Sequence, residues 1–130
     1  MDSLIIDAFE RSPEVRFDAV ARTLAIRGES YPEDASAVFG PIFAWLNQFF
    51  ADGGREPVAV EFELVYFNSS SAKALMNIFQ LLDRAAGGGT SVTVDWRYAA
   101  DDETMKEFGE DFSEDLAHVS FRLVEIKGGG

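Results

Sequence analysis

No cysteine occurs in the chain, and His118 is its only histidine. Without cysteine the protein forms no disulfide, has no thiolate metal site and offers no cysteine nucleophile. A lone histidine beside an apolar run is typical of a surface or capping residue, so we expect no metal site and no catalytic residue. Glycine motifs that hold phosphates are also missing, which leaves nucleotide binding without support. The sequence therefore predicts a protein that is not an enzyme and binds no cofactor.

Positive charge is scarce, and long apolar runs are missing. Only 11 lysines and arginines stand against 23 acidic residues, which gives a formal net charge of -12. This balance disfavours nucleic acids and anionic membrane surfaces as partners, because both are bound through basic residues. No apolar run approaches the roughly 20 residues that span a bilayer, and the first residues lack a signal-peptide pattern. We expect a cytoplasmic protein.

The chain has enough hydrophobic residues to form the core of one domain. Its 130 residues are 47% hydrophobic and include 12 phenylalanines, which is the size and composition of a single globular domain. We therefore assign residues 1–130 to one domain. Within it, residues 1–13 are predicted to be a flexible lead-in, and the three glycines at 128–130 to be a loose tail.

The most informative stretch is the junction at residues 64–76, where the spacing of apolar residues changes. Before it they recur at every second position, as in a strand over about residues 57–67: Val58, Val60, Phe62, Leu64 and Tyr66. After it they recur at three and four residues, as in a helix over about residues 70–86: Ala72, Leu75, Met76, Phe79 and Leu82. The residues 68–71 therefore lie at a strand-to-helix corner, on the partly positive end of a helix, where a phosphate is stabilised.

The remaining pattern predicts further strands over residues 15–20, 22–27, 92–98 and 119–126, and helices over residues 30–50 and from 101 onward. A serine, Ser30, followed three residues later by Glu33 is typical of a capping box at the start of the first helix. Inside that helix, Gly40-Pro41 predicts a kink or a restart, because an interior proline loses a hydrogen bond.

Alternating strands and helices predict parallel strands joined by right-handed crossovers. Polar residues occupy the strand positions of opposite parity to the core: Glu61, Glu63, Thr93, Asp95, Arg97, Ser120 and Arg122. A sheet covered on both faces would be apolar on both. The sequence therefore predicts an α/β domain with a mixed, mostly parallel sheet of about five strands and helices mainly on one face.

Two stretches together resemble the SiaC-type biofilm regulatory phosphoproteins, whose fold is similar to that of the STAS-class anti-sigma-factor antagonists. The first is Ser30-Tyr31-Pro32-Glu33-Asp34, and the second is Leu64-Val65-Tyr66-Phe67-Asn68-Ser69-Ser70-Ser71, followed by a helix. The resemblance covers about residues 15–126 and implies a single STAS-like domain. It also implies a non-enzymatic switch in c-di-GMP signalling.

The resemblance implies that a cognate Ser/Thr kinase phosphorylates the hydroxyl after the asparagine and that a metal-dependent phosphatase removes the phosphate. The acceptor here is Ser69, where the family often has threonine, and Asn68, Ser70 and Ser71 are its neighbours. The unmodified form is expected to bind and activate a diguanylate cyclase. We expect the partner surface to include the following residues: Tyr31, Pro32, Glu33, Asp34, Lys73 and Asn77.

Three alternatives stay open from the sequence. Ser69 or Ser70 could serve only as the N-cap of the helix. The domain could instead bind a small ligand at the strand ends, where open α/β sheets usually bind ligands. It could also be an assembly subunit without phosphoregulation. Phosphorylation of a serine at this corner would distinguish the switch from all three alternatives.

Overall fold

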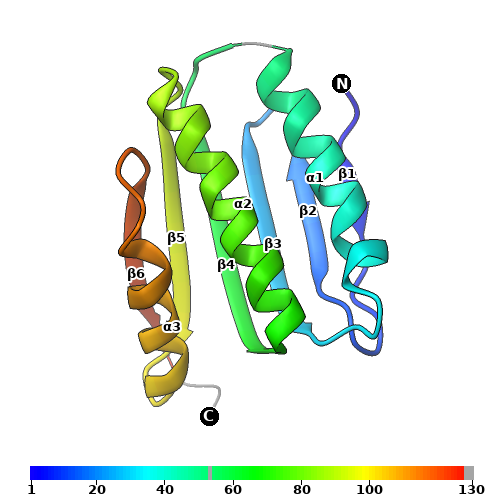
Figure 1. The fold of residues 1–130 in the computed structure, drawn as a ribbon, viewed down its shortest axis with the longest axis vertical. Helices are drawn as coiled ribbons and strands as arrows, with labels where there is room; N and C mark the ends of the chain where they lie inside the picture. Colours follow the sequence, from blue (N-terminus) through cyan, green and yellow to red (C-terminus); the bar gives the residue numbers. More distant parts are fainter. Residues whose placement is uncertain (53, 128–130) are drawn as a thin grey trace.

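The computed structural model describes residues 1–52 and 54–127, so the predicted tail at 128–130 lies outside the described residues. The chain forms one sheet with strand order β1-β2-β3-β4-β5-β6 and three helices that all cover the same face of it (Figure 1). The elements are β1 (Leu4–Ile6), β2 (Glu14–Asp18), β3 (Thr23–Ser30), α1 (Ala35–Ala51), β4 (Val58–Phe67), α2 (Ser69–Gly87), β5 (Val92–Ala99), α3 (Glu103–Ser113) and β6 (Ser120–Ile126).

The sheet is mixed, as the sequence predicts. β1, β2 and β3 pair antiparallel, whereas β3 to β6 pair parallel through the crossover helices. There are six strands instead of about five because Leu4–Ile6 pairs with β2. The prediction of a flexible lead-in is wrong for these three residues: Leu4 and Ile6 pack against the core, which outweighs the cost of ordering a short edge segment.

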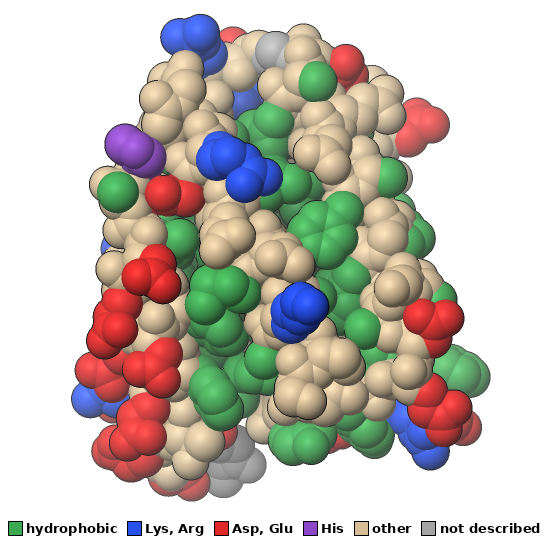
Figure 2. Space-filling model, in the orientation of Figure 1, with side chains coloured by type: hydrophobic (Ala, Val, Ile, Leu, Met, Phe, Trp, Pro, Cys, Tyr) green, Lys and Arg blue, Asp and Glu red, His purple; other side chains and the backbone are tan. Residues whose placement is uncertain are grey.

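The core lies between the sheet and the helices. β5 shows the pattern most simply, because buried and half-buried residues alternate along its whole length. Its Trp96 is 1% exposed and donates its indole N–H to the Met105 carbonyl of α3 at 2.9 Å. Gly109 lets α3 approach this ring, since a Cβ there would lie 2.5 Å from Trp96 Cδ1. Acidic side chains gather on the outer surface of α3 (Figure 2).

The start of α1 differs from the predicted capping box. Ser30 is the last residue of β3 and is 1% exposed, so it cannot cap the helix. The N-cap is Asp34, whose Oδ1 accepts the N–H of Ala37 at 3.2 Å. Ser30 was the wrong choice because β3 continues through it to pair with Phe67.

The helix α1 also passes through Pro41 without a restart. Gly40 explains part of this tolerance, because the ring of a proline clashes with the Cβ of a preceding helical residue and glycine has none. A bulky neighbour at that position would disfavour the helical backbone.

The end of β4 contains an irregularity that the alternating pattern hides. Gly28 pairs with Leu64 but Glu29 pairs with Tyr66, so Val65 is an extra residue in β4 and forms a β-bulge. The bulge reverses the parity of the last two residues. Tyr66, which the sequence pattern places on the same face as the core residues, is 53% exposed, whereas Phe67 is only 8% exposed and takes the buried position.

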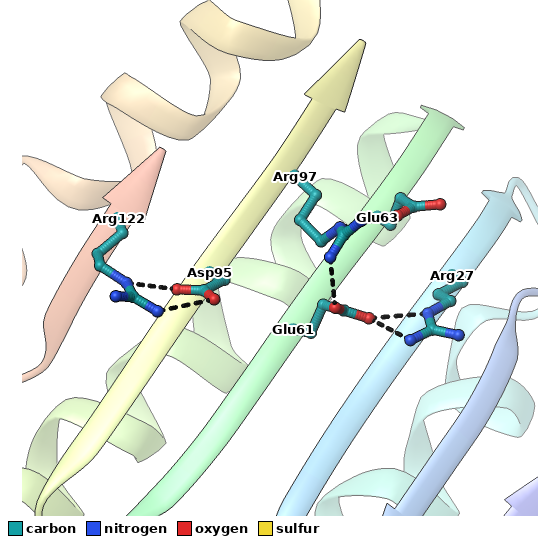
Figure 3. A network of polar contacts seen from close by, with 6 residues as sticks. All are labelled: Arg27, Glu61, Glu63, Asp95, Arg97 and Arg122. Atoms are coloured by element: carbon teal, nitrogen blue, oxygen red, sulfur yellow. Dashed lines mark hydrogen bonds and ion pairs between the residues drawn. The ribbon is translucent and has the colours of Figure 1, made fainter. Parts of the chain in front are cut away.

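The face of the sheet opposite the helices is polar, as predicted, and carries a ladder of ion pairs (Figure 3). Arg27 Nε donates to Glu61 Oε2 at 2.8 Å, and Arg97 donates to the other oxygen of Glu61 at 3.1 Å. The hydrogen bond to Glu61 raises the pKa of Arg27 above its ordinary value. Arg122 donates two hydrogen bonds to the Asp95 carboxylate, at 2.7 and 3.0 Å. These partly exposed pairs order the polar face of the sheet, but solvent screens them, so they contribute little to the stability of the fold.

Candidate functional site

The corner between β4 and α2 is organised by Asn68. Its side-chain Oδ1 accepts the N–H of Ser71 at 2.9 Å and the hydroxyl of Ser70 at 3.2 Å, which makes it the N-cap of α2. The alternative in which Ser69 or Ser70 is the cap is therefore wrong. Asparagine is a favoured N-cap because its short side chain reaches the unpaired N–H groups of the first turn.

Asn68 also joins the corner to the loop between β3 and α1. Its backbone N–H donates to Ser30 O at 3.0 Å, and its Nδ2 donates to Pro32 O at 3.4 Å. Two segments that are more than thirty residues apart in the chain are thus held together at this point. The start of α2 is consequently a fixed position on the molecule.

The three serines of the corner have different surroundings. Ser71 is fully buried at 0% exposure, and its Oγ lies 2.8 Å from Ser30 Oγ. Ser70 is exposed, with its hydroxyl directed to Asn68. Ser69 is exposed at the first position of the helix, and within residues 1–52 and 54–127 its hydroxyl makes no hydrogen bond. Ser69 therefore presents the most accessible hydroxyl of the three.

The loop at residues 31–34 lies at the same end of the sheet. The Tyr31 N–H donates to Arg11 O at 2.8 Å, its hydroxyl donates to Glu10 O at 3.2 Å, and its ring meets that of Tyr66 edge-on at 5.6 Å. The loop is thereby attached to the segment before β2. Tyr66 was not predicted as part of the site, because its exposure depends on the bulge at Val65.

The other predicted partner residues of this loop differ in their exposure to solvent. Glu33 is exposed and pairs with Arg11 at 2.8 Å. Asp34 is exposed and caps α1. Pro32 is buried, so it can shape the loop but presents no contact surface.

The remaining two predicted residues, Lys73 and Asn77, lie in an open groove between α1 and α2. The groove has a volume of about 400 Å³ and is lined by Ala35, Ser36, Phe39, Gly40, Phe43, Ser70, Lys73, Ala74 and Asn77. Residues from α1 were missed by sequence reasoning. A signal for them was present, since none of the 17 residues of α1 is charged in a chain with 23 acids.

The structure gives two further observations on the classes of function. Across residues 1–52 and 54–127, no group of three or more His, Asp or Glu side chains is placed to hold a metal ion. No helix in that part of the chain combines the length and apolarity needed to cross a membrane. The corner itself presents an exposed serine at the N-terminus of α2, beside the groove.

Known proteins resemble this chain over most of its length. Residues 6–126 match the model of the SiaC family regulatory phosphoproteins. An uncharacterised protein of Pseudomonas aeruginosa strain UCBPP-PA14 is 38% identical over 117 residues, which cover 90% of this chain and 92% of that protein. The chain therefore belongs to the SiaC family of regulatory phosphoproteins.

Solved structures from Pseudomonas aeruginosa share the fold. The crystal structure of apo-SiaC superimposes with a TM-score of 0.84 at 36% identity and covers 96% of this chain and 98% of its own. A chain in the crystal structure of the diguanylate cyclase SiaD in complex with its activator SiaC gives a TM-score of 0.89 at 35% identity, with coverage of 95% and 99%.

Proposed function

We propose that this protein is a cytoplasmic, non-enzymatic switch whose Ser69 is phosphorylated by a cognate Ser/Thr kinase and dephosphorylated by a metal-dependent phosphatase. The unmodified form binds and activates a diguanylate cyclase, and phosphorylation releases it. The observation that carries the proposal is the accessibility of the Ser69 hydroxyl at the first position of α2. The cyclase is chosen as partner because a family relative, SiaC, is the activator in a complex with the cyclase SiaD.

The chemistry of the switch is a reversible phosphoryl transfer. The kinase moves the γ-phosphoryl group of ATP to Ser69 Oγ, ADP leaves, and the hydroxyl proton passes to a base of the kinase. The phosphatase adds water to phosphorus, which releases inorganic phosphate and restores the hydroxyl. Neither step needs a catalytic group from this chain, which supplies only the acceptor.

Phosphorylation at this position is compatible with the fold. A phosphate adds about -1.5 to -2 charges, and the N-terminus of a helix favours such a charge by about 0.3 to 1 kcal/mol. The cap of α2 is held by Asn68 and not by the acceptor serine, so modification leaves the capping bond in place. The effect of the phosphate therefore falls on the partner and not on the stability of the domain.

The first test is intact-mass and phosphopeptide analysis of the protein purified from its own host. We expect one phosphoryl group on Ser69 that phosphatase treatment removes. Ser71 is the internal control, because its buried hydroxyl is inaccessible to a kinase. Unmodified protein under every growth condition would contradict the switch and favour the ligand-binding or assembly alternatives.

The second test compares cyclase binding by three variants. Ser69→Ala is expected to bind constitutively, and Ser69→Asp to bind more weakly while remaining folded. Ser91→Asp is the matched control, since it places the same charge on an exposed serine that lies before β5 and does not line the groove. Equal affinity of Ser69→Asp and the wild type would count against phosphorylation as the release signal.

A further inference from the structure

The surface formed by α1 and the first half of α2 is almost free of charge in a strongly acidic protein. α1 has no charged residue, and α2 has only Lys73 before Asp83. Hydrophobic side chains follow the boundary between the two helices, whereas acidic ones gather over α3 (Figure 2). This uncharged surface coincides with the groove that Lys73 and Asn77 line.

Lys73 is the single charged residue among the nine that line the groove. Its side chain is exposed, and within the described part of the chain it makes no ion pair. A lone cation in an otherwise uncharged groove favours a ligand that is mainly apolar and carries one carboxylate. The groove runs between two helices that begin at the same end of the sheet (Figure 1), which is a shape that accepts a third helix.

We propose that the groove between α1 and α2 holds an amphipathic helix of the partner, anchored by a carboxylate on the Lys73 ammonium, and that phosphorylation of Ser69 releases this helix by capturing that ammonium. The inference rests on the proposed switch and specifies how the switch acts. It makes Lys73 the residue that connects the modified corner with the partner surface.

The connection follows from the spacing on α2. Ser69 and Lys73 are four residues apart in one helix, and side chains at this spacing are neighbours. Lys73 lines the groove whereas Ser69 does not, so the Lys73 ammonium can turn either toward the groove or toward Ser69. A phosphate on Ser69 belongs to the same helix as Lys73. It therefore competes for the ammonium at a higher effective concentration than the carboxylate of a separate partner. It also repels the partner's carboxylate.

The test measures the affinity of SiaD from Pseudomonas aeruginosa for variants at Lys73, each unmodified and each phosphorylated at Ser69. Lys73→Gln is expected to weaken binding of the unmodified chain about tenfold, because a carboxylate then loses its charged partner. Lys73→Arg keeps the charge and is expected to retain most of the affinity. Arg84→Gln is the matched control, since it removes one cation from the far end of the same helix.

The decisive quantity is the coupling between the two positions. Phosphorylation is expected to weaken binding strongly in the wild type and in Arg84→Gln, and much less in Lys73→Gln. A second variant, Asn77→Trp, fills the groove and is expected to prevent binding in both states. Circular dichroism and thermal unfolding verify that these exposed-site variants are folded.

The outcomes separate the inference from the switch itself. If phosphorylation weakens binding but Lys73→Gln changes neither the affinity nor the effect of the phosphate, the inference is overturned and the switch stands. If Asn77→Trp binds like the wild type, the groove is not the docking site. If the wild type binds SiaD in neither state, the proposed cyclase partner and the inference both fail.

Discussion

Three consecutive serines of identical chemistry begin α2, yet each meets a different environment. Ser71 is buried against Ser30, Ser70 bonds to the capping asparagine, and Ser69 is exposed. The difference arises from the helical geometry, which turns successive residues by about 100 degrees and so directs them to the core, the cap and the solvent. Asn68 holds this arrangement.

We predict that Asn68→Ala lowers the free energy of unfolding by about 1 to 2 kcal/mol, because it removes the N-cap of α2 and the contact with Pro32. Ser69→Ala is the control and should change it by less than about 0.5 kcal/mol. Urea-induced unfolding monitored by circular dichroism measures both. A larger loss for Ser69→Ala than for Asn68→Ala would refute the assigned cap.

A second residue-scale contact closes the loop between α3 and β6. The Asp83 carboxylate accepts backbone N–H groups from Ala117, His118 and Val119, the shortest at 2.7 Å. Burial raises the pKa of Asp83, but the three N–H donors outweigh this effect and hold the pKa below its ordinary value. The ionised carboxylate is therefore the form that the folded state binds better.

From this we predict a pH-dependent contribution to stability. The folded-state pKa of Asp83 is lowered, so its stabilisation is complete above the ordinary aspartate pKa of about 4 and is lost as the pH falls through the lowered value. Asp83→Asn should cost about 1 kcal/mol at pH 7, a low figure because the side chain is partly exposed, and less near pH 2. Urea titrations at both pH values measure this, with Asp115→Asn, an exposed neighbour of the loop, as the control.

At the scale of elements, α1 is the unusual helix. It carries no charge, it contains a proline, and its exposed side borders the groove. Since Pro41 has no N–H, the carbonyl four residues earlier lacks its helical partner. The helix is maintained by its buried side chains, among them Ile42 and Leu46, which are no more than 1% exposed. Packing has therefore overruled local propensity in this helix.

We predict that Pro41→Ala raises the free energy of unfolding by about 1 to 3 kcal/mol, because it restores an N–H donor inside α1 and removes the ring from the helix interior. Pro57→Ala is the control, because Pro57 lies outside the helices and its loss should give no such gain. Thermal unfolding measures both variants. A destabilised Pro41→Ala would mean that the ring contributes more to packing than it costs in hydrogen bonding.

At the scale of the whole molecule, charge is distributed unevenly. Among the described residues, four arginines pair with acids on the open face of the sheet, and Figure 3 shows three of them: Arg27, Arg97 and Arg122, with Arg16 as the fourth. The remaining acids are in large excess, and they include a group over α3 (Figure 2). With a formal net charge of -12, the folded state is opposed by self-repulsion.

We therefore predict that the melting temperature rises as sodium chloride is increased from about 0.01 to 0.5 M, because screening reduces this repulsion more than it weakens the exposed ion pairs. A variant with Glu107→Gln, Glu110→Gln and Asp111→Asn, all on the exposed side of α3, should show a smaller rise. Differential scanning calorimetry measures both proteins. A fall in melting temperature with salt would show that the ion pairs dominate.

The sequence by itself determined the class of fold and the strand-to-helix corner at which the candidate site is proposed. The change of period at residues 64–76 is a local property, since strand and helix place their side chains with different spacing, and the structure has β4 and α2 on either side of it. The polar residues at alternate strand positions likewise indicated that helices cover one face only. These patterns are set by neighbouring residues in the chain, so the sequence contains them directly.

Tertiary structure alone decided which residues of the corner are presented. The pairing of β3 with β4 created the bulge at Val65 that exposes Tyr66, and it also kept Ser30 in the sheet, where Asp34 had to replace it as a cap. Leu4–Ile6 became a strand because β2 offered it an edge. The groove needs α1 and α2 side by side. Each of these features depends on contacts between distant segments, whose energies are absent from any local pattern.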